Sequence, residues 1–400
     1  MNARPEIIKL NPMNWPPPAV EYGPYRAHFF AGMEDISVQD WNAHNPNAYP
    51  FLSHAFLHAL ETSQSVGREK GMMPMHMQLL QEEQSLGFVP LYLKFHSYGE
   101  YIFDWEWARG AQAAGIDYYP KLLVGAPYTP AVGHRLLMDP KYFEIAATIL
   151  KSFCEQLGLS GVHVLHCLPE ESKALQKAGF ISRETHQYHF HNSGYENFGE
   201  FLNALKSRHR KQIKKERERA TDNTLTLGLV RGNTLSQEDW KRIYELYENT
   251  YQRKWGTPYL TPNFFKNMPS SVQQTVLAAI ARDSGGTIQA MSLSFESDTH
   301  LYGRYWGCAS AYDAIHFEFC YYRLIEYAIE TGKKVFEAGA QGEHKIKRGF
   351  VPVTIHSAHV LTDPRLHNAV AHFCQNESTQ EDHIKEFLGK LAPYKSSPNT

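Results

Sequence analysis

The spacing of hydrophobic and polar positions along the chain predicts both helices and strands. In DPKYFEIAATILKSFCEQLGLSG apolar residues recur every three to four positions and a glycine ends the pattern, which predicts an amphipathic helix. The short apolar run VHVLHC predicts a buried strand. After the connection EESKALQKAGF, the segment ISRETHQYHFH predicts a second strand. The first unit of the pattern is therefore helix, strand, connection and strand.

The same order returns later in the chain. HFEFCYYRLIEYAIETGKK predicts a helix that ends at a glycine, and KVFEAG, GEHKIKRGF and VPVTIHSAHV then predict a strand, a short basic connection and a strand. Both connections end in Gly-Phe, at Gly179-Phe180 and Gly349-Phe350. A repeated unit of this kind indicates two copies of one domain. The alternative is a chance likeness between two αβ units.

The remaining patterns predict further elements. SHAFLHALETS, capped by Ser53, SQEDWKRIYELYENTYQRKW and VQQTVLAAIARD predict helices. MPMHMQLLQ, GFVPLYLKFHS, TLTLGLV, TIQAMSLSFES and HLYGRYWGCAS predict strands. YIFDWEWA also alternates, which predicts a strand with Asp104 and Glu106 on one face and Trp105 and Trp107 on the other.

Length supports the duplication. The chain has 400 residues, too many for one ordinary core, and its 42% hydrophobic and 20% charged residues are typical of a globular protein. We expect an extended lead-in over residues 1–25, a first domain over 26–192, a second over 193–390 and a flexible tail over 391–400. The second domain contains a basic helix over 201–220.

Charge excludes one class of binding. The formal net charge is −2, so the whole surface does not attract nucleic acid or anionic membranes, although a local basic patch can. LKSRHRKQIKKERERA, which includes Arg208, Arg210 and Lys211, predicts a helix with one buried stripe and a cationic remainder. This remainder is either a solvated face or a contact for tRNA, cofactor phosphates or an anionic substrate.

Cysteine usage and hydropathy point to the cytoplasm. The five cysteines are scattered without a CxxC pair, which is typical of a reducing compartment, and no apolar run is long enough to span a bilayer. We expect no metal site. Histidines gather along VHVLHC and ETHQYHFH, but alternation on a strand separates them between two faces, and no HExxH motif supports them.

The richest chemistry lies in FEAGAQGEHKIKRGF. Its glutamates and histidine can act as base or acid when a group passes from a donor to an acceptor, and its cations and the backbone N–H groups beside its glycines can hold an anion. We expect catalytic roles for Glu337, Glu343 and His344. The residues expected to bind the donor or its phosphates are Gly339, Gln341, Gly342, Lys345 and Arg348, together with Arg304 in LYGRYWG and with Arg208, Arg210 and Lys211. The alternative is a solvated loop between two strands.

Two segments of the first half are candidates for contact with the acceptor. Asp104 and Trp105 lie in FDWEWA, where paired carboxylates can bind an amine. Tyr128 and Arg135 lie in the proline-braced PYTPAVGHR. The simpler interpretation of FDWEWA is a solvent-facing polar side opposite two tryptophans.

Longer motifs carry a resemblance to a known family. HSYGEYIFDWEWA, PYTPAVGHRLL, LYGRYWGC, HFEFCYYRLIEYAI and GAQGEHKIKRGF resemble the FemAB-like predicted N-acyltransferases, a family labelled peptidoglycan biosynthesis or recognition within the GNAT superfamily. The resemblance runs from about Trp41 to His359. It implies an α+β fold of two tandem GNAT-like domains, each a mixed, mostly antiparallel sheet flanked by helices. In that fold the acyl donor sits where the sheet splays.

The resemblance implies an N-acyltransferase with a small-molecule or peptide amine as acceptor. No cofactor is expected to stay bound, and acyl-CoA is expected as co-substrate. The first alternative is a Fem-type enzyme that uses aminoacyl-tRNA, held through the basic helix, to form a peptide bond on a cell-wall precursor. The second is a non-catalytic module that recognises cell-wall fragments. The sequence lacks a clean Gln/Arg-x-x-Gly-x-Gly/Ala pyrophosphate loop, with TPAVGHR and GAQGEH as the nearest pieces, and it does not give the oligomeric state.

Overall fold

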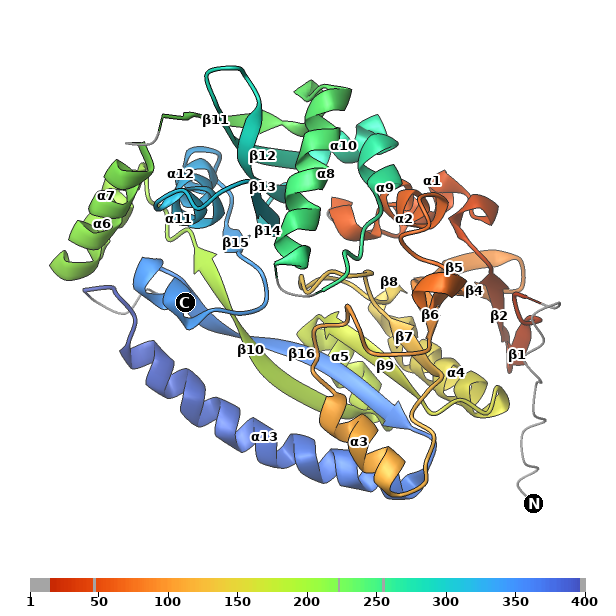
Figure 1. The fold of residues 1–400 in the computed structure, drawn as a ribbon. Coiled ribbons are helices and arrows are strands. Elements are labelled where there is room, and N and C mark those ends of the chain that lie inside the picture. Colours follow the sequence, from red (N-terminus) through yellow and green to blue (C-terminus); the bar gives the residue numbers. More distant parts are fainter. Residues whose placement is uncertain (1–14, 46–47, 222–223, 254–255, 396–400) are drawn as a thin grey trace. The chain divides into compact units, whose positions relative to one another are not determined.

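The computed structural model describes residues 15–45, 48–221, 224–253 and 256–395. The chain forms two compact units (Figure 1). Unit 1 comprises residues 1–185 and 354–382, and unit 2 comprises residues 186–353 and 383–400. The division passes through the two long strands β10 (Ile181–His191) and β16 (Val351–Leu361) and through the C-terminal helix α13 (Pro364–Lys390).

Unit 1 contains two groups of strands. One antiparallel sheet has the order β1-β2-β4-β5-β8. Its strands are β1 (Val20–Tyr22), β2 (Tyr25–Phe30), β4 (His76–Gln81), β5 (Gln84–Val89) and β8 (Leu137–Met138). The other group has the order β16-β9-β7-β6-β3. Its further strands are β3 (Met72–Pro74), β6 (Leu91–Lys94), β7 (Lys121–Val124) and β9 (Gly161–Cys167).

Helices cover these strands because their apolar residues recur at helical spacing. They are α1 (Val38–Ala43), α2 (His54–Thr62), α3 (Trp105–Ala113), α4 (Phe143–Gln156) and α5 (Pro169–Lys177), with the first part of α13. Short 3-10 turns lie at Met33–Asp35, Pro50–Leu52, Arg68–Lys70 and Pro140–Tyr142. The core lies between α4 and the strands, where the rings of Phe29 and Phe153 stack with centroids 4.0 Å apart.

Unit 2 has the strand order β11-β12-β13-β14-β15-β10. Its own strands are β11 (Thr226–Arg231), β12 (Val276–Arg282), β13 (Ile288–Glu296), β14 (His300–Cys308) and β15 (Val335–Glu337). Its helices are α6 (Phe198–Ala204), α7 (Ser207–Thr221), α8 (Gln237–Gln252), α9 (Pro262–Lys266), α10 (Ser270–Thr275), α11 (Ile315–Phe317) and α12 (Arg323–Glu330). A π-helical turn, Glu318–Tyr322, joins α11 to α12, and 3-10 turns lie at Gly232–Thr234 and Glu343–Arg348 (η8).

Both copies of the predicted repeat are visible in the element order. α4-β9-α5-β10 matches α12-β15-η8-β16, and Gly179 and Gly349 end the two connections with φ of 89° and 99°. The two copies exchange their last strands, since β16 pairs with β9 in unit 1 and β10 pairs with β15 in unit 2. Each unit also contains one parallel strand pair, β7 with β9 and β14 with β15, within otherwise antiparallel pairing.

Two predicted elements are wrong. FDWEWA is not a strand, because α3 begins at Trp105 after Tyr101 and Phe103 adopt φ of 60° and 54°. Asp104 is consequently buried while Glu106 is exposed, so the two carboxylates do not share a face. VQQTVLAAIARD is not one helix, because α10 ends at Thr275 and β12 follows. β12 pairs on both edges, which outweighs the helix propensity of its alanines.

The chain ends also differ from the expectation. Val20–Tyr22 of the expected lead-in pairs with β2, while residues 1–14 lie outside the described part. In the expected tail the buried Tyr394 donates a hydrogen bond to the Gly349 carbonyl at 2.6 Å, so this segment packs on unit 2 as far as 395. Residues 396–400 lie outside the described part. Residues 354–382, expected in the second domain, group with unit 1.

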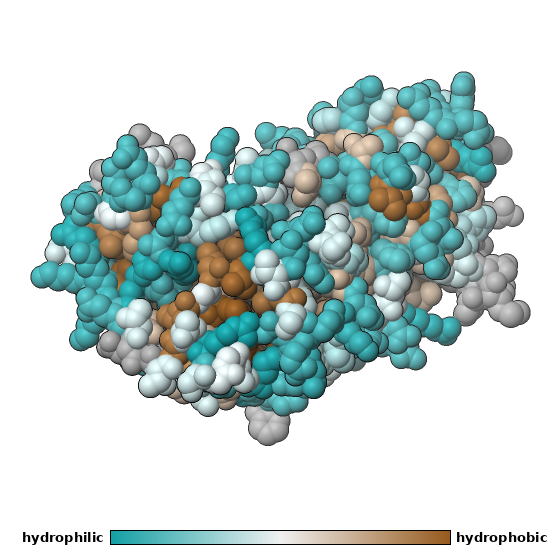
Figure 2. All heavy atoms as spheres, turned by 90° about the horizontal axis from the view of Figure 1, so that it is seen from above, coloured by the Kyte–Doolittle hydropathy of each residue, from teal (hydrophilic) through white to brown (hydrophobic). Residues whose placement is uncertain are grey.

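Surface character adds little to these boundaries. On the face shown in Figure 2, hydrophilic side chains predominate and hydrophobic ones gather in a few patches. Within the described ranges, no helix combines the length and hydropathy that a bilayer-spanning segment needs.

Candidate active site

The sheet of unit 2 opens between β14 and β15. These parallel strands pair only from His300 with Val335 to Tyr302 with Glu337. β15 then ends, whereas β14 continues to Cys308 with its other edge on β13. A Cβ added at Gly303 would lie 3.6 Å from the Glu337 carbonyl oxygen, so β14 and β15 are still close where they begin to separate. Beyond Gly303 no described strand pairs with this edge of β14.

A β-bulge marks the same place on β14. Ser294 faces Gly303 and Leu293 faces Tyr305, which leaves Arg304 as the extra residue. Bulges bend a strand, interrupt its ladder and are over-represented beside active sites. The guanidinium carbon of Arg304 lies 5.4 Å from the centroid of the Tyr305 ring, and the side chain is partly exposed. The predicted binding residue Arg304 therefore lies at the opening of the sheet.

Glu337 lies at the other side of the opening, as the last residue of β15. It is buried, with 4% of its surface exposed, and its Oε2 lies 3.9 Å from Nε2 of His189 on β10. Burial lowers the pKa of His189 to about 3, so this imidazole is neutral at physiological pH. A buried carboxylate beside a neutral imidazole can accept a proton without first giving up a strong ion pair to His189.

The segment after Glu337 is a tight turn rather than an open polar loop. Gly339 and Gly342 adopt φ of 84° and 118°, which glycine tolerates best, and η8 follows. Lys345 is buried and donates to the Gly339 carbonyl at 2.7 Å. Burial lowers the pKa of Lys345 to about 8. This lysine therefore clamps the turn, while Gln341 and Glu343 are exposed.

His344 and Arg348 point to different partners. The ring of His344 shares a hydrogen bond of 2.8 Å with the Tyr321 hydroxyl, and burial lowers its pKa. Arg348 is buried, donates to Glu216 of α7 at 3.0 Å and to the Tyr322 hydroxyl at 2.9 Å. A guanidinium held in this way stabilises unit 2. The structure therefore does not support the phosphate contact expected of Arg348.

The basic helix α7 packs on η8 through one side and exposes the other. Arg217 joins Glu318 and Glu326 at 2.9 and 2.8 Å, and Ile213 is buried. The exposed cations are Arg208, Lys211, Lys214 and Lys215, with Arg210 partly exposed. Within the described part of the chain none of these five forms an ion pair. α7 thus carries an uncompensated positive face, as the sequence predicts.

The four residues expected to contact an acceptor lie in unit 1 and do not form one surface. Asp104 is buried against Lys121 at 2.7 Å. Tyr128 is buried and donates to the Ser65 carbonyl. Arg135 is fully buried and donates to the carbonyls of Leu165 and Ala131.

The predicted acceptor contacts of Asp104, Tyr128 and Arg135 are therefore replaced by roles inside the fold. Only Trp105 is exposed.

Some residues of these sites were not predicted. In the sequence His189 stands out only as one of several clustered histidines, and no motif marks Lys121 or Glu216. A lysine inside the apolar run YYPKLLV was the available signal for Lys121, since a charge on a buried strand needs a partner. Within the described part of the chain, no group of three or more potential ligands is placed to hold a metal ion.

Solved structures define the class of fold. The structure of FemX has a TM-score of 0.52 at 12% identity and is matched over 84% of this chain and 98% of FemX. The C-terminal domain of a putative lysylphosphatidylglycerol synthetase from Agrobacterium fabrum has a TM-score of 0.50 at 9% identity, over 85% of this chain and 95% of that domain. The expected α+β class with two tandem GNAT-like domains is confirmed.

Sequence comparison then gives the family. Residues 32–396 match the FemAB-like family, described as peptidoglycan biosynthesis/recognition, and the chain belongs to it. Membership makes it a Fem-type, peptidoglycan-related transferase, broadly an acyltransferase. A search of curated proteins gives no match.

Proposed function

We propose that unit 2 transfers an aminoacyl group from aminoacyl-tRNA to the amine of a cell-wall precursor peptide. The observation that carries this proposal is the opening between β14 and β15, with a buried carboxylate at one side and a bulged strand edge at the other. In acyl transfer the carbonyl oxygen becomes an oxyanion, and backbone N–H groups that no strand uses can stabilise it. Beyond Gly303 the described part of the chain places no strand on that edge of β14.

The reaction needs one proton acceptor at the attacking amine. The nitrogen attacks the ester carbonyl carbon, a C–N bond forms, and the C–O bond to the ribose breaks. Glu337 accepts the proton that the amine loses, and the departing ribose hydroxyl takes up a proton, so the carboxylate is regenerated. His189, which lies beside the Glu337 carboxylate, is neutral and adds no charge to the site.

The positive face of α7 supports tRNA as the donor. Its exposed cations lie on the helix that contacts η8, the segment that follows Glu337 by six residues. A phosphate backbone is bound by lysine and arginine side chains of this kind. TPAVGHR and GAQGEH are the segments most similar to a pyrophosphate-binding loop, and both make contacts within the fold. Arg135 of the first is fully buried, and Lys345 donates a hydrogen bond to the Gly339 carbonyl of the second. These contacts favour tRNA over acyl-CoA.

Removing the positive face tests the donor. The variant Arg208→Ala/Lys211→Ala/Lys215→Ala is expected to bind charged tRNA more weakly and with a shallower salt dependence. Each lost phosphate contact lowers the slope of log K against log[salt] by about 0.7 to 0.9. Filter binding between about 50 and 200 mM salt measures both quantities.

A matched variant controls for net charge. Lys141→Ala/Lys173→Ala/Lys177→Ala removes three exposed cations of unit 1 and is expected to leave the slope unchanged. Equal slopes for the two triple variants would remove α7 from donor binding. Saturable binding of a cell-wall peptide without turnover of any donor would instead favour a recognition module.

A further inference from the structure

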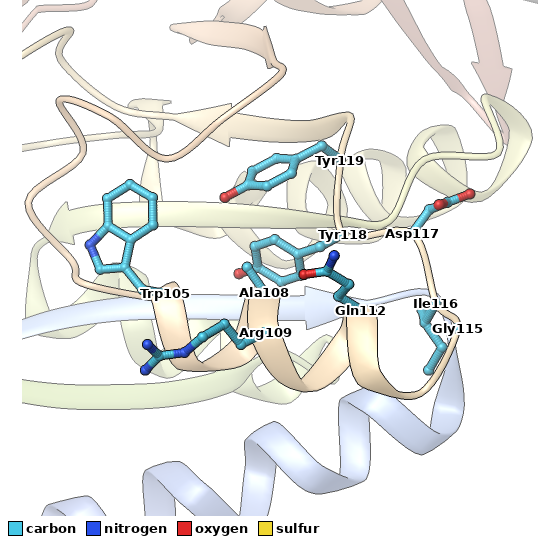
Figure 3. A pocket seen from close by; sticks show the side chains of 9 residues that line it. All are labelled: Trp105, Ala108, Arg109, Gln112, Gly115, Ile116, Asp117, Tyr118 and Tyr119. Atoms are coloured by element: carbon cyan, nitrogen blue, oxygen red, sulfur yellow. The ribbon is translucent and has the colours of Figure 1, made fainter.

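Unit 1 contains an open pocket of about 760 Å³ beside α3 (Figure 3). Arg109 and Gln112 reach it from α3, and the turn after the helix contributes Asp117. The rings of Trp105, Tyr118 and Tyr119 complete it. The pocket therefore combines aromatic faces with one guanidinium, one amide and one carboxylate.

Aromatic rings around this pocket are exposed at a cost. Trp105 is 38% exposed, and its ring centroid lies 5.0 Å from that of Tyr98, which is 58% exposed. Phe95 and Phe103 of the same segment are exposed as well. Single exposed apolar side chains are ordinary, but a cluster of large ones marks a binding surface.

A buried ionic network around Lys121 contacts the residues that line the pocket. Nζ of Lys121 lies 2.8 Å from Glu100 and 2.7 Å from Asp104, and all three side chains are fully buried. The Tyr118 hydroxyl donates to Asp104 at 2.8 Å, and the Tyr119 hydroxyl shares a 2.8 Å hydrogen bond with Ser97.

The network fixes the wall residues. Asp104 directly precedes Trp105, and the other two anchored side chains are the pocket tyrosines. Burying charges lowers stability unless their mutual attraction offsets the loss of hydration. A network of this cost placed directly behind the rings preorganises them for a ligand.

We propose that this pocket binds a saccharide. The apolar C–H face of a pyranose matches an indole or phenol ring, and its neighbouring hydroxyls match the paired polar atoms of Arg109, Gln112 and Asp117. Arg109 and Asp117 carry opposite charges, so the lining has no surplus cation for a phosphate. The inference goes beyond the proposed acyl transfer and does not depend on it.

The test uses the full chain with tetra-N-acetylchitotetraose and cellotetraose as probes in titration calorimetry. At least one probe is expected to bind saturably, and Trp105→Ala and Gln112→Ala are each expected to weaken it at least tenfold. Phe387→Ala, an exposed aromatic on α13 outside both the lining and the aromatic cluster, is the matched control and is expected to bind normally. Thermal unfolding of each variant verifies folding, which the exposure of these side chains favours.

Three results overturn the proposal. These are failure of both probes to bind the wild type, unchanged affinity in both pocket variants, and an equal loss in Phe387→Ala. If neither probe binds while phosphatidylglycerol vesicles bind through Phe95 and Trp105 alike, the aromatic cluster is a membrane contact instead. Glu337→Gln is expected to retain sugar binding, which separates failure here from failure of the proposed transfer.

Discussion

Replacing Glu337 by glutamine is expected to lower turnover by about 10²–10⁴-fold, the usual contribution of a positioned general base. Glutamine keeps the size and hydrogen-bonding capacity of the side chain but cannot accept the proton of the attacking amine. Binding of the charged tRNA is expected to stay within about threefold of wild type, because Glu337 faces the acceptor in the proposed reaction. Single-turnover transfer to a precursor peptide measures the loss.

The neighbouring acid gives a control for this variant. Glu343 lies in the same segment but is exposed, and Glu343→Gln is expected to keep near-normal turnover. His344→Gln removes the hydrogen bond to Tyr321 and tests the third predicted catalytic residue. A full loss in Glu343→Gln with normal turnover in Glu337→Gln would assign the base to η8 instead of β15.

Replacing Lys121 by methionine is expected to lower the free energy of unfolding by about 3–5 kcal/mol. The variant leaves Glu100 and Asp104 buried without their common cation. Burial opposes the charge of Lys121, but the two carboxylates outweigh it and raise the pKa of this lysine. Urea denaturation monitored by circular dichroism measures the change.

The pH dependence distinguishes charge from packing. Without Lys121 the pKa of both carboxyls rises in the folded state above the unfolded value. The folded variant then binds more protons than the unfolded chain. Its free energy of unfolding is therefore expected to rise as the pH falls from about 7 to 5. The triple variant Lys121→Met/Glu100→Gln/Asp104→Asn removes all three charges of the network and is expected to recover part of the loss at pH 7. A deficit that is independent of pH would mean that packing, not charge, is responsible.

The repeat was predictable because each copy carries its own periodicity and its own Gly-Phe ending. The exchange of β10 and β16 was not predictable, because nothing in the local pattern of a strand states which sheet it joins. The alternation in FDWEWA predicted a strand, but the left-handed backbone at Tyr101 and Phe103 ends the extended segment and starts α3. Alternating polarity therefore mispredicts this segment, because the backbone conformation of the preceding loop determines where α3 begins.

The candidate site was predictable in place more than in detail. Their chemistry makes Glu337, Arg304 and the basic helix candidates, and the fold brings Glu337 and Arg304 to the opening of the sheet. Arg348 and Arg135 have the same chemistry, yet buried partners occupy them. Those partners, Glu216 and backbone carbonyls, are distant in sequence or lack a side-chain signal. A charged residue that is buried needs a partner, and only the fold shows whether that partner is a ligand or another group of the protein.

In the proposed reaction unit 2 takes its acyl group from aminoacyl-tRNA. Thermal unfolding of the purified chain in the presence of charged tRNA, uncharged tRNA, and acetyl- and long-chain CoA thioesters tests it most directly. A ligand at about 100 times its dissociation constant adds roughly 2.7 kcal/mol of stability. We expect a rise in Tm with charged tRNA that exceeds the rise with uncharged tRNA, and no rise with the thioesters. A rise with a CoA thioester alone would contradict it.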